Sequence, residues 1–294
     1  PADTVVNLDT GATFTGSTAI QDAVDNANSD NTLRVGSGTF DESVTVDVDG
    51  LTLEGPNAGL AGDSGQRGAE ASFQTGGNID ADNVTIDGFE LVPGPNAGSG
   101  QSRTEILGSN VVITNSDVDV PDGDAPLRLQ ASANDTVITQ NQFANGDGGG
   151  FVINARPKPG ATNLIDGVEI TDNTFENITG TGTTAIQAKG YTNANISGNS
   201  FDNIGEDAVR LAGNVSGTEV TDNEFSNYAQ DSDIGVPAGA IIANGLSGDN
   251  IDISGNQFND AGGDDRYVVE FSSDVLNVGD IQNNNQFDQN TQLV

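Results

Sequence analysis

A six-residue phrase that recurs along the chain constrains the fold more than any other feature of the sequence. Each copy contains an apolar residue, two polar or turn-forming residues, an Asn, a polar residue and a Phe, as in residues 170–175, and the last copy is slipped. The Asn recurs after 32, 26, 24, 33 and 29 residues, at Asn141, Asn173, Asn199, Asn223, Asn256 and Asn285. This spacing, with loop insertions of variable length, is typical of one structural unit stacked upon itself.

The phrase predicts a short strand that enters a bend, because Asn and Gly tolerate left-handed dihedral angles. Stacked coils would place six rings in one interior ladder, with the Asn residues along the adjacent turn: Phe143, Phe175, Phe201, Phe225, Phe258 and Phe287. The pattern indicates a parallel β-solenoid, in which each coil buries its apolar face against its neighbours. A β-propeller has longer repeats of about 40 to 50 residues with aromatic signatures, and the chain has no Trp. The Leu spacing of a leucine-rich repeat is also absent.

The continuous repeat predicts a single domain over residues 1–294, with coils from about 83 to 287. Residues 17–27 predict a helix with one apolar face, capped by Ser17 or Thr18, which we expect to cover the first coil. Residues 55–77 are rich in Gly, Ala, Pro and Ser and predict a surface excursion. No matching helix is expected after Phe287, so we expect either that a short loop shields the final coil or that this coil docks end to end with a partner.

The formal net charge is −35, from 44 acidic and nine basic residues. At molar salt the Debye length falls to about 3 Å and screens this self-repulsion, so the composition favours a halophile's solvated surface. A basic stripe for nucleic acid is absent, and an anionic membrane would repel the chain. We therefore expect neither nucleic-acid binding nor direct membrane insertion.

Cys, His, Met and Trp are all missing, which excludes disulfides, a thiol nucleophile, an imidazole base and the usual Zn sites. No apolar run reaches the roughly 20 residues of a membrane helix. The chain begins with Pro1, which we interpret as a processed form with its leader removed. An extracellular or cell-surface location agrees with five glycosylation sequons, at Asn83, Asn134, Asn177, Asn195 and Asn214.

The start of the chain resembles a known group. Residues 17–24 (Ser-Thr-Ala-Ile-Gln-Asp-Ala-Val), 33–40 (Leu-Arg-Val-Gly-Ser-Gly-Thr-Phe), 44–46 and 51–55 are similar to the opening of right-handed parallel β-helix proteins of the pectate lyase-like superfamily, especially haloarchaeal secreted and cell-surface members. The resemblance implies an all-β, right-handed, single-stranded parallel β-helix with an N-terminal capping helix. That superfamily includes lyases, hydrolases, esterases, phage tailspikes and noncatalytic surface proteins, so it implies no single chemistry.

A second strand follows most copies of the phrase. If Ile186, Val209, Ile241 and Val269 point inward, alternation aligns four outward residues, Gln187, Arg210, Ile242 and Glu270. Six of the nine cations lie on or beside these strands, which predicts a neutral or mildly positive lane suited to acidic polysaccharide or a neighbouring subunit. The candidate binding residues of this lane are Arg128, Arg156, Lys158, Gln187, Lys189, Tyr191, Arg210, Arg266 and Tyr267. The alternative is that the cations pair with local carboxylates such as Glu206, Asp207 and Glu270.

Catalysis has few candidates. The polygalacturonase-type Gly-His-Gly segment and the Trp of the pectin methylesterase pattern have no counterpart here, which argues against both activities. A Ca²⁺-dependent lyase remains open, with Arg210, Lys189 or Arg128 as the base. A pair of carboxyl groups for glycoside hydrolysis is available as Asp207 with Glu270, or Glu206 with Asp233.

We expect that the protein requires no cofactor. Binding of Ca²⁺ remains an open alternative, because Ca²⁺ prefers oxygen ligands and the loops contain Asp carboxylates. Its candidate ligands are Asp117, Asp119, Asp122 and Asp124, or Asp264 with Asp265. We expect a noncatalytic extracellular surface or appendage protein of a halophile, archaeal in origin, that self-associates or docks with other surface proteins and binds glycans. The alternatives are a polysaccharide lyase or hydrolase acting on acidic polysaccharide, and a viral spike or fibre.

Overall fold

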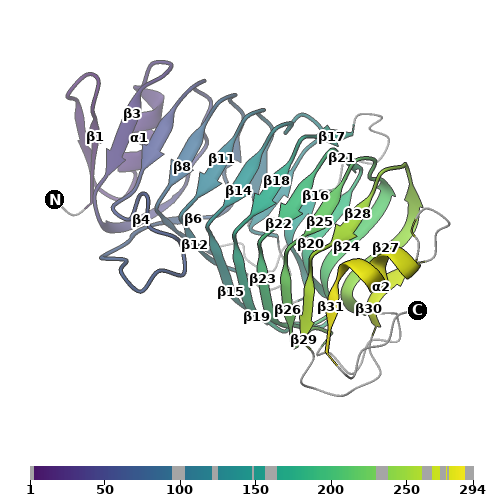
Figure 1. Cartoon of the computed structure of the whole chain (residues 1–294). Coiled ribbons are helices and arrows are strands. Elements are labelled where there is room, and N and C mark those ends of the chain that lie inside the picture. The colour runs from purple at the N-terminus through teal and green to yellow at the C-terminus, as the bar shows by residue number, and fades with distance from the viewer. Residues whose placement is uncertain are drawn as a thin grey trace.

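The computed structural model of the chain is a parallel β-helix, which confirms the predicted solenoid (Figure 1). It describes residues 3–94, 103–120, 125–147, 149–155, 164–229, 238–259, 267–271, 276 and 278–288. Most coils contribute one strand to each of three long sheets, here named A, B and C, so strands distant in sequence lie side by side along the stack.

Sheet A has 11 strands and joins β1 and β2 antiparallel to an otherwise parallel series. Its strands in spatial order are β2 (Thr13–Thr15), β1 (Thr4–Asn7), β3 (Thr32–Val35), β5 (Thr52–Glu54), β8 (Thr85–Asp87), β11 (Val112–Thr114), β14 (Val137–Thr139), β18 (Glu169–Thr171), β22 (Asn195–Ser197), β25 (Glu219–Thr221) and β28 (Asp252–Ser254).

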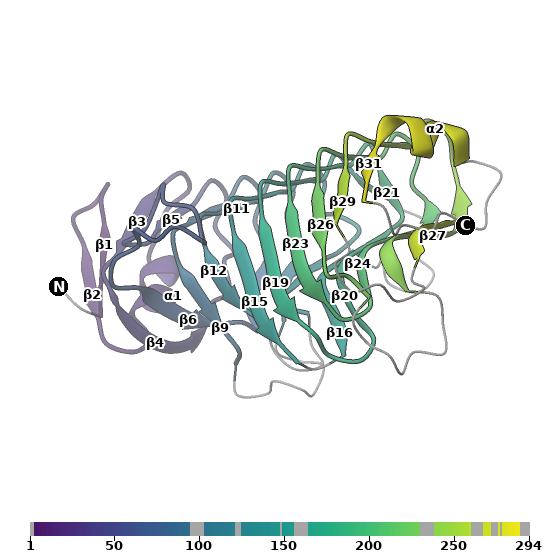
Figure 2. The ribbon, with the colours of Figure 1, turned by 60° about the horizontal axis from the view of Figure 1, so that its bottom comes forward.

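Sheet B has 10 strands and carries the Phe ladder. Several of its strands, from β12 to β31, are seen side by side in Figure 2. Its strands are β4 (Gly38–Ser43), β6 (Ala71–Gln74), β9 (Glu90–Val92), β12 (Asp117–Asp119), β15 (Gln142–Gly146), β19 (Thr174–Ile178), β23 (Ser200–Ile204), β26 (Glu224–Ser226), β29 (Gln257–Asn259) and β31 (Gln286–Phe287). The six predicted rings stack with centroids 4.8 to 5.2 Å apart and interplanar angles of 4 to 8°. The spacing of the phrase therefore predicted the interior column correctly.

Sheet C has eight strands. They are β7 (Asn78–Ile79), β10 (Thr104–Ile106), β13 (Leu127–Leu129), β16 (Gly150–Ala155), β20 (Thr183–Lys189), β24 (Asp207–Asn214), β27 (Gly239–Ser247) and β30 (Tyr267–Phe271). A two-stranded sheet, β17 (Ile165–Asp166) with β21 (Tyr191–Thr192), widens two coils between sheets C and A.

The predicted Asn series forms a buried ladder in the turn between sheets A and B. Each Asn from Asn141 to Asn256 donates its backbone N–H to the side-chain oxygen of the next Asn, at 2.9 to 3.0 Å. Its Nδ2 also donates to the carbonyl of an apolar residue in the preceding coil, as Asn199 does to Ile170 at 2.8 Å. The ladder thus satisfies backbone groups that the turn would otherwise bury unpaired.

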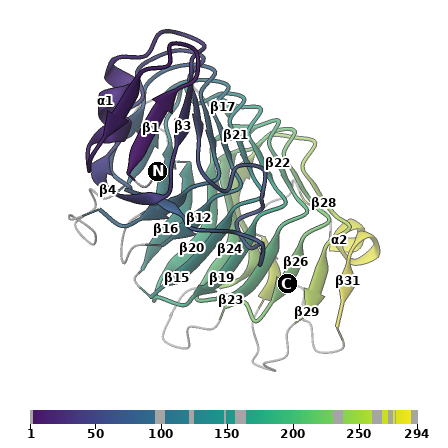
Figure 3. The same cartoon turned by 90° about the vertical axis from the view of Figure 1, so that its left-hand side faces the viewer.

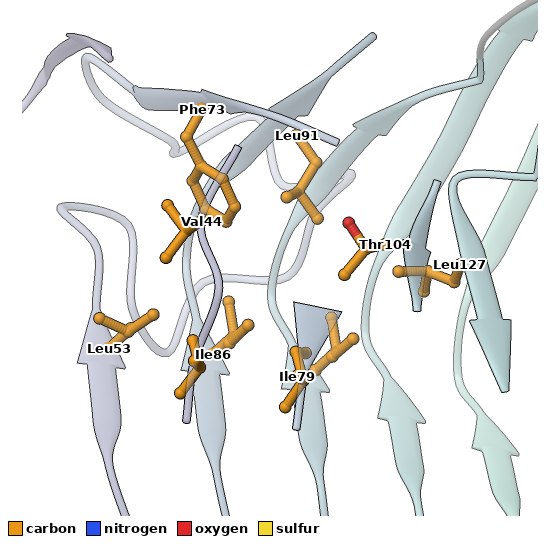
Figure 4. Close-up of a pocket in the computed structure, with 10 residues that line it drawn as sticks. Val44, Leu53, Phe73, Ile79, Ile86, Leu91, Thr104 and Leu127 are labelled. Atoms are coloured by element: carbon orange, nitrogen blue, oxygen red, sulfur yellow. The ribbon is translucent and has the colours of Figure 1, made fainter. Parts of the chain in front are cut away.

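The core is apolar and closely packed. One void of about 10 Å³, close to the space needed by a single water molecule, lies among the early coils (Figure 4). Its lining is apolar except for Thr104. This void belongs to the core, and Thr104 alone does not provide the several convergent polar groups that a ligand site needs.

Helix α1 (Ala19–Asp25) occupies the predicted position and lies against β1, β2 and β4 at the N-terminal end (Figure 3). The predicted side-chain cap is wrong: the N-cap is Thr18, and its hydroxyl makes no capping hydrogen bond. Glu42 of β4 caps the helix instead, because its two carboxylate oxygens accept the N–H groups of Ile20 and Gln21 at 2.9 and 3.0 Å. A residue distant in sequence therefore fixes α1 to the first coil.

We expect Glu42→Gln to lower the free energy of unfolding by about 1 kcal/mol, because the amide provides only one acceptor oxygen and no charge at the helix N-terminus. Urea unfolding at constant molar salt measures the loss. Thr18→Ala is the matched control and should cost clearly less. Equal losses in the two variants would show that Glu42 is not the cap.

The excursion occupies residues 55–70, shorter than predicted, since the chain re-enters sheet B at β6. It crosses later coils: Gly62 N–H donates to the carbonyl of Gln140 at 2.8 Å, and the Thr174 hydroxyl donates to Asp63 at 3.1 Å. Arg67, with 8% of its side chain exposed, pairs with Glu70 at 2.9 Å. Its guanidinium also donates to the carbonyl oxygens of Leu60, Phe89 and Asn115. The excursion is therefore fastened along the outside of several coils.

The C-terminal end differs from the prediction. Residues Val278–Asn284 form a second helix, α2, which lies at the end of the stack beside β28 (Figures 1 and 2). The carbonyl of Asn284 accepts the N–H of Gly255 at 2.7 Å, and Asn285 then continues the Asn ladder. Helix α2 precedes Phe287 and was not predicted from the sequence, and the last strand of sheet A is not left uncovered, because α2 lies against it.

Candidate functional site

One row of residues lies in register across neighbouring strands of sheet C: Glu105, Arg128, Asn154, Gln187, Arg210, Ile242 and Glu270. The alignment of Gln187, Arg210, Ile242 and Glu270 follows the predicted alternation. Adjacent members lie one strand apart, about 4.8 Å. We name the first five residues, Glu105 to Arg210, the polar row.

The polar row is close to electrically neutral on a strongly acidic molecule. On or directly before β10, β13, β20 and β24 stand four cations, Arg103, Arg128, Lys189 and Arg210, and three carboxylates, Glu105, Glu206 and Asp207. Glu105 accepts from Arg103 at 3.0 Å and from Gln130 at 2.9 Å, and it lies 3.8 Å from Arg128. Local pairing, the alternative weighed from the sequence, therefore occurs at this end of the row.

A second charged group surrounds Arg210 at the other end of the row. Arg210 Nε donates to Asp207 Oδ2 at 2.6 Å, and Nη2 lies 2.5 Å from the same oxygen. Nη2 also donates to Glu206 Oε1 at 3.0 Å. Asp207 is fully buried and Glu206 is 5% exposed, whereas 27% of the Arg210 side chain is exposed. We name these three residues the charged triad.

Two amides lie side by side between the charged ends of the row. Asn154 and Gln187 are register partners on β16 and β20. Within the described part of the chain, Asn154 Oδ1 and Gln187 Oε1 are buried and accept no hydrogen bond. Because buried polar atoms in native proteins almost always have partners, these two oxygens are expected to bind water or a ligand. Sequence reasoning named Gln187 but missed Asn154, whose place in the row depends on the register of β16.

The other predicted lane residues do not all reach this surface. Lys189 is exposed, at the end of β20. Tyr191 is fully buried, so its assignment as a surface binding residue is corrected; burial also raises the pKa of its hydroxyl. Arg156, Lys158 and Arg266 lie outside the described residues, and the Tyr267 side chain is not among those described.

Each predicted carboxyl pair for hydrolysis has only one member among the described side chains, so the pairs stay a prediction. Asp207 is held by Arg210 beneath the surface, while Asp233 and the Glu270 side chain are outside the described set. A buried, ion-paired carboxylate cannot flank a glycosidic bond in solvent. The structure therefore gives Asp207 a role next to the row rather than on a substrate.

Two of the proposed Ca²⁺ ligands, Asp117 and Asp119, lie in sheet B and not in sheet C. Both belong to β12, and Asp122, Asp124, Asp264 and Asp265 are outside the described residues. Burial, followed by the charge of Asp119, raises the pKa of Asp117 to about 6, although Arg67 opposes the shift. Among the residues placed by the structure, no three acidic side chains are grouped to hold a metal.

No described helix has the length and apolar character needed to cross a membrane.

The five sequons differ in accessibility. Asn83 and Asn177 are exposed and adopt φ values of 59° and 55°, Asn83 at a bend and Asn177 within β19. The other three are half-buried, namely Asn134, Asn195 and Asn214. Glycosylation stays a prediction, and Asn83 and Asn177 are its most accessible acceptors.

Comparison with known proteins identifies the class of fold. No protein-family model and no curated protein matches the sequence. The chain is similar to an alginate lyase from Paenibacillus sp. str. FPU-7, with a TM-score of 0.60, 12% identity and coverage of 94% of this chain and 95% of that one. It is also similar to the alginate lyase AlyF-OU02, with a TM-score of 0.52, 12% identity and coverage of 92% and 60%. The chain thus shares the parallel β-helix fold of these lyases.

Proposed function

We propose that the chain is a noncatalytic polysaccharide-binding β-helix that holds a sugar polymer along the polar row. The observation that carries this proposal is the pair of adjacent amides, Asn154 and Gln187, whose buried oxygens lack protein partners in the described structure and lie beside the exposed edge of Arg210. Amides and an arginine spaced one strand apart offer hydrogen bonds to successive hydroxyl and carboxylate groups of an extended polymer.

Binding without cleavage is favoured because the cation best placed to act on a substrate is already engaged. A uronate lyase needs a base that removes the proton next to the carboxylate and a group that neutralises that carboxylate. Arg210 is held by two carboxylates at 2.5 to 3.0 Å, and Asp207 is fully buried. These contacts support a positioning role for the charged triad.

The surroundings that we propose for this function are extracellular and highly saline. The net charge of −35 supports this, since molar salt would screen the repulsion between carboxylates. An archaeal surface or appendage protein, alone or in self-associated form, fits the same features. Light scattering in molar salt tests self-association: a strict monomer would contradict that part of the proposal.

A binding experiment tests the proposal. Calorimetric titration at molar salt should detect binding of polygalacturonate or alginate, and Gln187→Ala should weaken it about fivefold, the loss of one hydrogen bond of about 1 kcal/mol. Gln257→Ala, which removes an exposed Gln of β29 on sheet B, is the matched control and should leave affinity unchanged. Absence of binding to every polymer tested, or equal affinity in the two variants, would contradict it.

A polysaccharide lyase is the second candidate, favoured by the fold shared with the two alginate lyases. The same samples distinguish it, because a lyase generates unsaturated sugar ends that absorb ultraviolet light. Accumulation of such product, abolished by Arg210→Ala, would replace the binding assignment with the enzymatic one.

A further inference from the structure

The charged triad holds one more negative than positive charge when both of its carboxylates are ionised. Arg210 contacts Asp207 and Glu206 through Nε and Nη2, and the backbone N–H of Gly239 donates to Asp207 Oδ1 at 3.3 Å. Within the described residues, Arg210 Nη1 donates no hydrogen bond. The guanidinium therefore retains one nitrogen for a ligand, while its charge is already more than balanced.

The residues in register with the triad on either side carry no charge. On β20, Thr184 pairs in register with Asp207 and Gln187 with Arg210. On β27, Ile242 pairs with Arg210, and Gly239 provides its N–H to Asp207. A further charge on these strands is Lys189, which is exposed at the end of β20 in register with Ala212, two residues beyond Arg210. The charge of this end of the polar row is thus set by Asp207, Glu206 and Arg210, with Lys189 beyond them.

Asp207 is the member of the triad suited to take up a proton. It is fully buried, and burial is the main cause that raises its pKa to about 7; Arg210 opposes the shift and Glu206 adds to it. An anionic ligand that approached Nη1 would further disfavour the ionised carboxylate. Protonation of Asp207 would leave Arg210 and Glu206 as a neutral pair with a free guanidinium edge.

We propose that the charged triad selects the charge class of the bound polysaccharide: the site accepts a uronate carboxylate at Arg210 Nη1 when Asp207 holds a proton, and disfavours it when Asp207 is ionised. The inference rests on the proposed binding function and adds to it the ligand class and its regulation. Where Asp207 is ionised in the free protein, binding of a uronate at this position takes one proton from solvent onto the Asp207 carboxylate; where Asp207 is already protonated, no proton is taken up, and in neither case does a covalent bond change. Neutral polysaccharide binds without this proton.

Titration of wild type, Asp207→Asn and Glu206→Gln with polygalacturonate and with dextran, at molar salt, tests the inference. Wild type should bind polygalacturonate about tenfold more tightly at about pH 6 than at about pH 8, and paired buffers of different ionisation enthalpy should report proton uptake. Asp207→Asn, which imitates the protonated acid, should bind at both pH values with the strength of wild type at the lower one. Glu206→Gln, which removes the excess charge by another route, should also reduce the pH dependence.

The outcomes separate the two proposals. Polygalacturonate binding by wild type that is equally strong at both pH values, or pH dependence retained by Asp207→Asn, overturns the triad inference alone. Absence of binding by every variant overturns the binding function and the inference together.

A measurement of stability without ligand tests the inference independently. Between about pH 4 and pH 7 the native state holds a proton on Asp207 that the unfolded state has lost, so the stability of wild type relative to Asp207→Asn should fall as pH rises through that window. A constant difference would overturn the inference.

Discussion

Phe201→Ala is expected to lower the free energy of unfolding by about 4 to 8 kcal/mol. Phe201 is fully buried and stacks between Phe175 at 4.8 Å and Phe225 at 4.9 Å. Truncation of a buried Phe costs about 3 to 5 kcal/mol, and each lost aromatic pair adds about 0.5 to 1.5 kcal/mol. Urea unfolding at constant molar salt, followed by circular dichroism, measures the loss.

Two control variants separate the contributions in the Phe ladder. Phe201→Leu keeps most of the buried apolar volume and should cost only about 1 to 2 kcal/mol, since it removes the ring stacking but leaves little cavity. Phe287→Ala, at the end of the ladder with a single ring neighbour and a half-buried side chain, should cost less than Phe201→Ala. Equal losses at positions 201 and 287 would contradict a stack whose stability is the sum of neighbour contacts.

Asn199→Ala is expected to cost about 3 to 5 kcal/mol, although the change removes only one small polar group. Its Oδ1 accepts the backbone N–H of Asn173 at 3.0 Å, and its Nδ2 donates to the carbonyl of Ile170 at 2.8 Å. Both backbone groups would be left buried and unpaired, at about 1 to 3 kcal/mol each. The same urea experiment measures the loss.

Asn195→Ala is the matched control for the Asn ladder, because Asn195 lies on the half-buried outer face of sheet A in the neighbouring strand, β22. It should change stability by less than about 0.5 kcal/mol. Asn199→Asp tests the donor separately: its carboxylate can accept but cannot donate to Ile170, so it should also destabilise the protein strongly. Full stability of either Asn199 variant would show that the ladder does not hold the coils together.

The sequence was sufficient to predict the interior of the solenoid because its determinants recur. Phe143 and its five counterparts repeat with an Asn two residues earlier, and the alternation of strand residues predicted the row that contains Gln187 and Arg210. Repetition shows which residues of neighbouring coils lie in register, whereas the sequence of a single strand does not show this. The burial and the bonding of the Asn ladder were less evident from the sequence. The pattern indicates a turn, but it does not show that one side-chain amide bonds to two coils.

Features made by single contacts could not be predicted in this way. Glu42 and Asp207 are two of 44 acidic residues, and their roles depend on a helix end and on Arg210 that only the fold brings near. Tyr191 follows Gly190, whose φ of 78° interrupts the strand alternation and places the ring inside. Helix α2 contains Gly279 and several Asn and Gln residues, a composition of modest helix propensity, so its contact with β28 was needed to reveal it.

The excursion at residues 55–70 links positions that the ribosome makes far apart in time. The hydroxyl of Thr174 reaches Asp63 across 111 residues of sequence, whereas neighbouring coils join residues about 30 apart. Synthesis delivers the N-terminal segments first. The early coils can therefore stack as they emerge, but the excursion cannot complete its contacts until β19 has been synthesised. Completion of the N-terminal third is therefore tied to elongation past the middle of the polypeptide.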